Sequence, residues 1–228
     1  MALLAIEASG AGCSAALWRA GAILAERRVA LEHGHAAALL PLVQAAMAEA
    51  AAAGLAWGDL AAVGVTVGPG SFTGIRVGLA AARGFGLALA IPVLGVTSFE
   101  AMAWGVPAAA RAGGALAVVI DSGRASRFLQ SFDAELRPLA PPAAIELDAL
   151  PAALPAPPCL IAAAGRLPAA GAAGAAGRPV VASSPDAAVL AVLVAARRAR
   201  GDSFLPPSAV YLRPPDASVP RAGGRIRA

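Results

Sequence analysis

Short apolar runs separated by Gly, Ala and Ser dominate the first quarter of the chain. Three of these runs have the length of a strand: residues 3–8, 14–19 and 23–29. Their spacing is typical of antiparallel strands joined by hairpins. A helix is predicted over residues 35–53, because apolar side chains recur there every three to four positions. These side chains are Leu39, Leu42, Val43 and Met47.

A strand, a tight turn and a helix are predicted between residues 61 and 90. Residues 61–67 form an apolar, partly β-branched run, which Gly68-Pro69-Gly70 ends. The hydroxyl of Ser71 or Thr73 can cap the helix that follows. Its small residues recur every four positions, at Gly74, Gly78, Ala82 and Gly86. Glycine costs up to about 1 kcal/mol relative to alanine inside a helix, so this stripe indicates close contact with the chain's own sheet or with a second protein.

The plan of the first strand returns in the middle of the chain. Residues 116–123 repeat residues 3–10 as an apolar strand, an acidic residue and small residues. A second strand follows at 126–132, and two lobes of like topology are the simplest interpretation. We therefore predict an N-terminal lobe over residues 1–103 and a C-terminal lobe over residues 104–228.

Weaker signals complete this prediction. They give a strand at 92–96, a short helix from Thr97 with a capping-box pattern, strands near 159–163 and 179–182, and a last helix from Pro185 to about residue 200. The last helix and a basic tail fall in the predicted C-terminal lobe.

Several catalytic and cofactor-binding patterns are excluded by residue type or spacing. The chain has no lysine, so it cannot hold a P-loop. Gly68, Gly70 and Gly74 are spaced one residue too widely for a dinucleotide fingerprint. The two histidines, His33 and His35, diverge on a helix and have no third ligand in view, so we predict no metal site.

Charge and hydropathy suggest a location and one further contact. The net charge is +4, and residues from Arg197 onward carry seven arginines and two aspartates. Such a basic tail can touch RNA phosphates or remain solvated. The N-terminus lacks the pattern of a secretory signal, and Arg83 and Pro92 interrupt the longest apolar stretch. We expect a cytoplasmic protein with no membrane span.

Three segments together resemble the TsaB (YeaZ) family. The central one is Gly68-Pro69-Gly70-Ser71-Phe72-Thr73-Gly74-Ile75-Arg76-Val77-Gly78-Leu79-Ala80. The others are Leu4-Ala5-Ile6-Glu7-Ala8-Ser9 and Tyr211-Leu212-Arg213-Pro214-Pro215-Asp216-Ala217. This resemblance implies an α/β protein with the duplicated fold of actin, sugar kinases and Hsp70 ATPases, which is ribonuclease H-like, with two lobes that each hold a mixed sheet flanked by helices.

The resemblance also implies a function. It predicts a non-catalytic partner of TsaD, the enzyme that places threonylcarbamoyl on adenosine 37 of tRNAs reading codons that begin with A. Implied partners are TsaD, the ATPase TsaE and tRNA through the complex, and a homodimer is a further expectation. No cofactor is expected on the isolated chain, whereas ATP or ADP and a divalent metal ion can bind in the complex. The alternative is a small ATPase or phosphotransferase that uses the cleft between the lobes.

Two sets of residues are candidates for these roles. The predicted partner interface consists of Gly74, Gly78, Ala82, Gly86, Ile75 and Arg76, with Leu39 and Val43 of the first long helix. By resemblance, Glu7, Ser9 and Asp121 stand where enzymes of this fold address metal and phosphate. Glu7 replaces the usual aspartate, and Ser126 stands where a glutamate is usual. These departures favour a vestigial site, with both acids facing solvent at hairpin turns.

Overall fold

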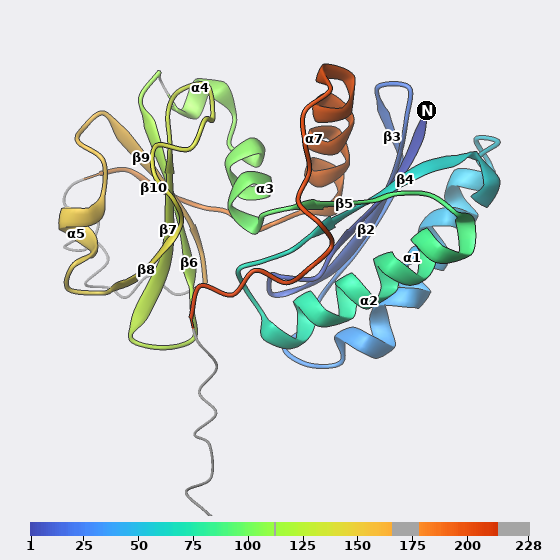
Figure 1. The fold of residues 1–228 in the computed structure, drawn as a ribbon, viewed down its shortest axis with the longest axis horizontal. Coiled ribbons are helices and arrows are strands. Elements are labelled where there is room, and N and C mark those ends of the chain that lie inside the picture. The colour runs from blue at the N-terminus through green and yellow to red at the C-terminus, as the bar shows by residue number, and fades with distance from the viewer. Residues whose placement is uncertain (112, 166–177, 214–228) are drawn as a thin grey trace, which may run out of the picture.

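Two five-stranded mixed sheets lie side by side in the computed structural model, which describes residues 1–111, 113–165 and 178–213 (Figure 1). The first sheet contains β1 (Ala2–Glu7), β2 (Gly12–Arg19), β3 (Ala22–Ala30), β4 (Leu60–Thr66) and β5 (Val93–Val96). The second contains β6 (Ala115–Asp121), β7 (Ser126–Phe132), β8 (Ala143–Glu146), β9 (Cys159–Ala164) and β10 (Val180–Ala182).

The two sheets have the same topology. Their strand orders are β3-β2-β1-β4-β5 and β8-β7-β6-β9-β10. In each sheet the first three strands are antiparallel, and the last two run parallel to the first. The repeat predicted from residues 3–10 and 116–123 is confirmed, and the chain has a duplicated actin-like fold.

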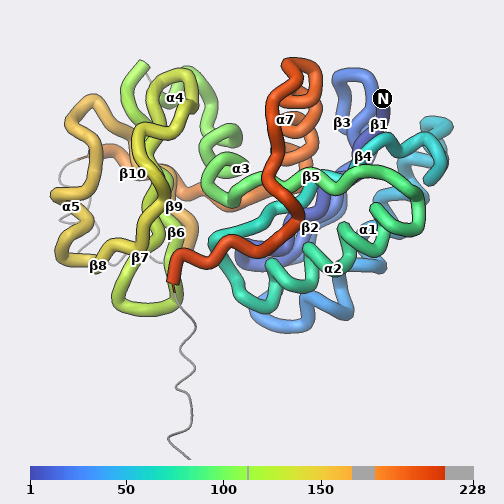
Figure 2. The backbone as a smooth tube through the Cα atoms, viewed as in Figure 1, coloured from blue at the N-terminus to red at the C-terminus, as the bar shows by residue number. Residues whose placement is uncertain are grey.

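Helices cover both faces of the first sheet. The helices among the described residues are α1 (His35–Ala51), α2 (Phe72–Leu89), α3 (Ser98–Gly105), α4 (Ala108–Arg111), α5 (Leu150–Ala153) and α7 (Ala187–Arg200), with a 3-10 turn at Trp57–Asp59. In Figures 1 and 2, α1 and α2 lie side by side on one face, and α7 lies on the other.

The alternation of side chains along β1 explains how one strand serves both helical layers. Leu4 and Ile6 point into the core beneath α1 and α2, whereas Leu3 and Ala5 point into the core beneath α7. All four side chains are fully buried. Because both faces of β1 are covered, the strand is an uninterrupted apolar run.

Three helices begin at side-chain caps that the sequence signals. Ser71 Oγ accepts a hydrogen bond from the Gly74 amide at 3.2 Å, at the start of α2. Thr97 and Glu100 form the predicted capping box of α3. Asp186 caps α7 by accepting from the amides of Ala188 and Val189 at 2.8 and 3.1 Å.

The placement of α7 corrects the predicted lobes. The sequence analysis put this helix in the C-terminal lobe, but it packs on the first sheet, where Leu190 and Val194 meet Ala16 and Ala62. A Cβ at Gly64 would lie 2.9 Å from the Val194 side chain, so the small residues of the sheet let the helix approach closely. The first lobe is therefore completed by a segment that follows the second lobe in the chain.

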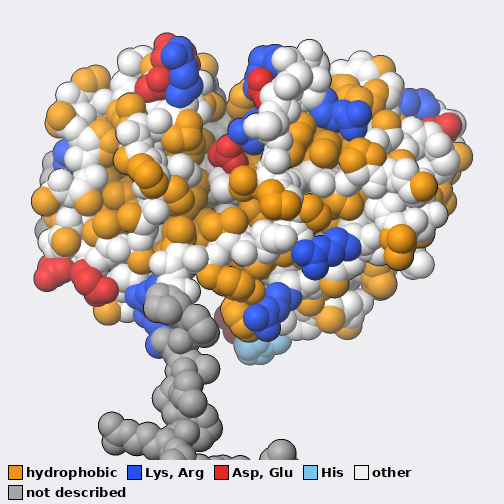
Figure 3. All heavy atoms as spheres, in the orientation of Figure 1, with side chains coloured by type: hydrophobic (Ala, Val, Ile, Leu, Met, Phe, Trp, Pro, Cys, Tyr) orange, Lys and Arg blue, Asp and Glu red, His pale blue; other side chains and the backbone are white. Residues whose placement is uncertain are grey.

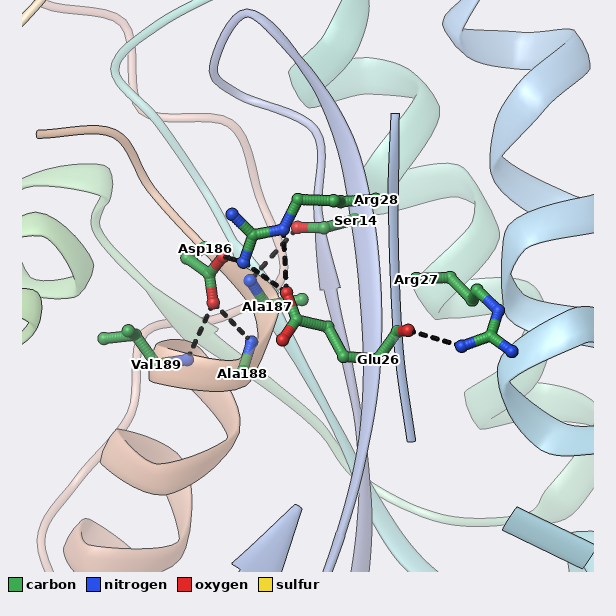
Figure 4. A network of polar contacts seen from close by, with 8 residues as sticks. All are labelled: Ser14, Glu26, Arg27, Arg28, Asp186, Ala187, Ala188 and Val189. Carbon is green, nitrogen blue, oxygen red and sulfur yellow. Dashed lines mark hydrogen bonds and ion pairs between the residues drawn. The ribbon is translucent and has the colours of Figure 1, made fainter. Parts of the chain in front are cut away.

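Polar contacts fix the N-terminus of α7 to β2 and β3 (Figure 4). The Ala187 amide donates to Ser14 Oγ at 3.1 Å. Arg28 forms ion pairs with both Asp186 and Glu26, so the residue that caps α7 is also held by β3. These contacts orient the helix on its sheet.

The small-residue stripe of α2 faces inward, which corrects the predicted interface. Gly74, Gly78, Ala82 and Gly86 are all buried within the first lobe. A Cβ at Gly74 would overlap the carbonyl oxygen of Ala8, and one at Gly86 would overlap the Val93 side chain. The stripe lets the helix backbone lie close to its own sheet, which is the intrachain alternative left open by the sequence.

Most of the other predicted interface residues are buried as well. Ile75, Leu39 and Val43 belong to the core between the two helices and the sheet, so they are wrong as exposed contact residues. Arg76 alone in that set is exposed. α2 has the length and apolar composition of a membrane-spanning helix, but core helices meet the same criteria, and its buried face packs against the sheet.

The C-terminal segment, residues 205–213, contacts both lobes. Leu205 exchanges two backbone hydrogen bonds with Gly95, and the Val210 amide donates to Val67 O at 2.8 Å. Leu212 then packs against the core of the second lobe, and Arg213 donates to Ser126 Oγ. One short segment therefore contacts both sheets (Figure 2).

Several short elements escaped the sequence analysis. They are the turn at Trp57–Asp59, helices α4 and α5, and strand β8, which lies in a stretch rich in Ala, Pro and Gly over residues 138–184. The predicted strands near 159–163 and 179–182 are confirmed as β9 and β10. The basic tail, with Arg221, Arg225 and Arg227, lies outside the described residues, as do residues 166–177.

Alanine substitutions at two glycines of α2 test the inward stripe. Gly74→Ala should lower the free energy of unfolding by about 3 kcal/mol, since the new methyl group overlaps the Ala8 carbonyl. Gly84→Ala is the control, because a Cβ there meets nothing within 4 Å. It should stabilise the protein by up to about 1 kcal/mol. Urea denaturation measures both values, and equal stability of Gly74→Ala and wild type would contradict the packing.

Candidate functional site

A buried carboxylate lies where the first strand of the first lobe ends. Glu7 is the last residue of β1 and is only 3% exposed. β1 and β4 run parallel with Ile6 opposite Val65, so Glu7 lies beside Thr66, the last residue of β4. Glu7 Oε1 accepts hydrogen bonds from the Ser9 amide and hydroxyl, both at 2.5 Å, and from Thr66 Oγ1 at 3.2 Å. Glu7 is therefore held entirely by its own lobe.

Burial changes the protonation of this group. Desolvation raises the pKa of Glu7 to about 7, although hydrogen bonds from Ser9, Thr66 and Gly10 act in the opposite direction. The expectation that Glu7 faces solvent at a hairpin turn is wrong. The carboxyl is instead a core group that is about half protonated near neutral pH.

The turn after Glu7 is packed against the glycine-rich loop that precedes α2. The Ser71 amide donates to Ser9 O at 2.8 Å, and a Cβ at Gly70 would overlap the same oxygen. On the other side, Ser9 Oγ and Ser98 Oγ share a hydrogen bond of 2.7 Å. The Ser9 hydroxyl thus bonds to Glu7 and Ser98, and its carbonyl bonds to the loop. The polar groups of this turn are therefore hydrogen-bonded within the protein. In enzymes of this fold, the equivalent turn contacts phosphate.

The acidic residue of the second lobe has a different environment. Asp121 ends β6, and its Oδ1 accepts from the Gly123 amide at 2.9 Å and pairs with Arg127 at 3.3 Å. Its side chain is about one-quarter exposed. Ser126, at the position of the family's glutamate, is buried and lies beside Ser122 and Arg213. No hydrogen bond or ion pair joins Glu7 to Asp121 in the part of the chain that the structure describes.

Metal-binding side chains do not gather anywhere in the described ranges, where no group of three His, Cys, Asp or Glu residues could hold an ion. His33 is exposed and His35 is buried at the first position of α1. Cys13 and Cys159 are both buried and unpaired. The structure therefore offers no protein-only site for a resident metal among these residues.

A cleft of about 530 Å³ lies between the N-terminus of α2, the β6–β7 turn and the C-terminal segment. Its lining includes Phe72, Arg76, Arg124, Tyr211 and Arg213. Figure 3 shows basic side chains on both sides of the gap between the lobes, at the lower edge of the molecule. Two segments that lie far apart in the sequence, 69–76 and 210–213, thus meet at one surface.

The comparisons with known proteins agree with this architecture. The family model described as "TsaD: tRNA N6-adenosine threonylcarbamoyltransferase" matches residues 28–196. The chain belongs to this TsaD family. A comparison with curated proteins found no match.

Two solved structures from Pseudomonas aeruginosa resemble the chain over nearly its whole length. One is described as YeaZ, with a TM-score of 0.76 and 26% identity. The match covers 92% of this chain and 99% of the YeaZ chain. The other is described as an uncharacterized protein with similarity to peptidase YEAZ, with a TM-score of 0.75, 26% identity, and coverage of 93% and 99%. Together with the TsaD family model, these matches confirm the predicted resemblance to the TsaB (YeaZ) group.

The cleft side chains were missed as site residues. Phe72, Tyr211 and Arg213 were named only as part of the segments that mark the family, and Arg124 was given no role. A signal was present, because each segment places an aromatic residue within four positions of an arginine. The sequence could not show that these pairs meet.

The raised pKa of Glu7 predicts how stability depends on pH. The ordinary pKa is near 4.5 and the folded value is about 7, so the folded protein binds more protons than the unfolded chain between these values. Stability should therefore fall by about 3 kcal/mol as pH rises from 4.5 to above 7. Glu7→Gln, which does not titrate and keeps an acceptor oxygen, should lack this component.

Urea denaturation of wild type and Glu7→Gln at several pH values measures the difference. We expect the variant to gain stability relative to wild type as pH rises, with most of the gain between pH 5 and 7. Parallel stability profiles for the two proteins across this range would contradict the assignment.

Proposed function

We propose that this protein is a non-catalytic accessory subunit of the bacterial complex that forms N6-threonylcarbamoyladenosine at position 37 of tRNAs reading codons that begin with A. Its role there is to bind and support the catalytic homologue TsaD. Membership of the TsaD family and the full-length likeness to YeaZ support the tRNA-modification context. The observation that carries the non-catalytic role is the turn at Glu7, whose polar groups are bonded to the protein itself.

The geometry of this turn argues against phosphate chemistry by the isolated chain. A nucleotide phosphate would need the amides and hydroxyls that now bond to Glu7, Ser98 and the carbonyl of Ser9. It would also approach a carboxylate buried without a cation partner among its hydrogen bonds. The second lobe offers Asp121, which is already paired with Arg127. We therefore favour a supporting role over the alternative of a small ATPase or phosphotransferase.

The surface proposed for TsaD is the outward face of α1 and α2. With the glycine stripe turned inward, the outward side carries mostly small and apolar residues. These include Ala36, Leu40, Ala80, Gly84, Leu87 and Ala88. Leu87, in the last turn of α2, is 86% exposed, which leaves a large apolar side chain almost entirely in solvent. An exposed apolar patch of this kind is typical of a protein-protein contact.

The shared family domain supports TsaD as the protein that binds the outward face of α1 and α2. The TsaD family model covers residues 28–196, which include both α1 and α2. A catalytic member therefore carries an equivalent helix pair, and two such pairs can pack together through their apolar faces. The same argument permits a homodimer through this face, which the experiment below separates from the heterodimer.

Other members of the proposed assembly follow from the family context. We include the ATPase TsaE and tRNA, with ATP or ADP and a divalent metal ion bound in the complex. The isolated subunit needs no cofactor in this proposal. Its proposed location is the cytoplasm, where tRNA is modified.

A charge placed on the outward face tests the docking surface. Leu87→Glu should abolish association with TsaD, because burial of an unpaired carboxylate is strongly unfavourable. Val192→Glu is the matched control, since Val192 is 39% exposed on α7, on the opposite face of the sheet. Circular dichroism should show both variants folded.

Size-exclusion chromatography with light scattering gives the readout, for each variant alone and mixed with TsaD. We expect the heterodimer with wild type and Val192→Glu, and separate proteins with Leu87→Glu. A folded Leu87→Glu variant that still forms the heterodimer would contradict the proposed surface. Loss of self-association alone would assign the face to a homodimer instead.

A further inference from the structure

The described lining of the cleft between the lobes combines aromatic and basic side chains. Among the residues that the structure describes, twelve line the cleft, of which three are arginines and three are aromatic, and none of these twelve is acidic. The arginines are Arg76, Arg124 and Arg213, and the aromatic residues are Phe72, Phe128 and Tyr211. The rest of the lining is apolar apart from Ser122. A ligand for this cleft should therefore be anionic and should also offer a flat apolar surface.

The aromatic part of the cleft is arranged as a fixed platform. The Arg76 guanidinium lies 3.7 Å from the centre of the Phe72 ring. Arg76 Nε also donates a hydrogen bond to Tyr211 Oη at 3.0 Å, and the Phe72 and Tyr211 rings are 5.6 Å apart. Phe72 is nevertheless 56% exposed and Tyr211 is 48% exposed. Rings that are held in place yet open to solvent are suited to stacking with a planar group.

The basic part of the cleft comes from three separate elements. Arg76 lies on α2, Arg124 lies in the β6–β7 turn, and Arg213 is the last described residue of the C-terminal segment. Arg124 is exposed, and Arg213 is positioned by its hydrogen bond to Ser126 Oγ. Arginines that are spread in this way can reach successive phosphate groups along a nucleic-acid strand. Each guanidinium presents several N–H donors in a fork.

We propose that this cleft binds a single-stranded segment of RNA, with bases stacked on Phe72 and Tyr211 and phosphates held by the arginines. Stacking platforms beside basic grooves are the general means of binding single strands. An acidic peptide would satisfy the charges but would leave the exposed rings without a partner. The inference deepens the proposed function, because it rests on the tRNA-modification role for the identity of the RNA, whereas the cleft itself is defined by the structure.

Fluorescence anisotropy with the full-length protein tests this site. The probe is a fluorescein-labelled single-stranded RNA of about eight nucleotides, a length within the range that one stacking groove covers. Binding is measured for wild type and for Phe72→Leu, Arg124→Gln and Arg137→Gln at several salt concentrations. Arg137→Gln removes the same charge as Arg124→Gln from an exposed site that does not line this cleft.

The two cleft variants should weaken binding in different ways. Phe72→Leu should reduce affinity about tenfold with an unchanged salt dependence, since it removes a stacking surface and no charge. Arg124→Gln should reduce the slope of log affinity against log salt by about 0.7, which corresponds to one phosphate contact on a single strand. Arg137→Gln should bind like wild type.

Three outcomes of the RNA-binding measurements would overturn the proposal. They are an absence of RNA binding, equal losses for Arg124→Gln and Arg137→Gln, and complete displacement of the RNA by ATP at equimolar concentration, which would make the cleft a mononucleotide site. An acidic peptide that binds with the same dependence on Phe72 would also contradict it. The chromatography with TsaD is independent of these results. Cleft variants that no longer bind RNA but still associate with TsaD would support both proposals. RNA binding by a protein that does not associate with TsaD would contradict only the proposed function.

Discussion

The close contact between the start of α2 and the end of β1 determines much of this molecule. Gly70 and Gly74 place their backbones against the carbonyls of Ser9 and Ala8, where no larger residue fits. The contact closes the turn that holds Glu7, and it turns the glycine stripe of α2 inward. It also leaves the opposite side of α2 on the surface and places Phe72 and Arg76 at the mouth of the cleft. The buried carboxyl, the exposed helical face and the cleft thus share one structural cause.

Duplication of the sheet topology does not make the two lobes equivalent. The first sheet is covered on one face by α1 and α2 and on the other by α7, which arrives after the second lobe is complete. The segment after α7 then returns across Gly95 and Val67 to the second lobe, where Leu212 is packed. Enzymes that close a cleft need lobes that can move relative to each other. Here one segment forms backbone hydrogen bonds with Gly95 and Val67 of the first lobe and packs Leu212 in the second, so it links the two lobes.

Local signals predicted most of the fold, whereas contacts between distant segments had to be observed. The repeat of residues 3–10 at 116–123, the caps at Ser71 and Thr97, and the apolar period of α1 are properties of short stretches, and each was confirmed. The stripe of glycines shows which side of α2 packs closely but not what covers it. Close packing against the chain's own sheet and against a partner protein both require small side chains. The burial of Glu7 and the meeting of Arg76 with Tyr211 depend on residues 59 and 135 positions away, which no local pattern encodes.

We propose that packing of the protein against itself occupies the first-lobe turn and leaves the isolated chain without a nucleotide site there. Calorimetric titration of the purified full-length protein with ATP and Mg²⁺, followed by an assay for released phosphate, tests this most directly. The packing of this turn predicts no saturable heat that depends on Glu7 and no turnover. Saturable binding or hydrolysis that Glu7→Gln or Asp121→Asn abolishes would contradict it and would favour the small-ATPase alternative.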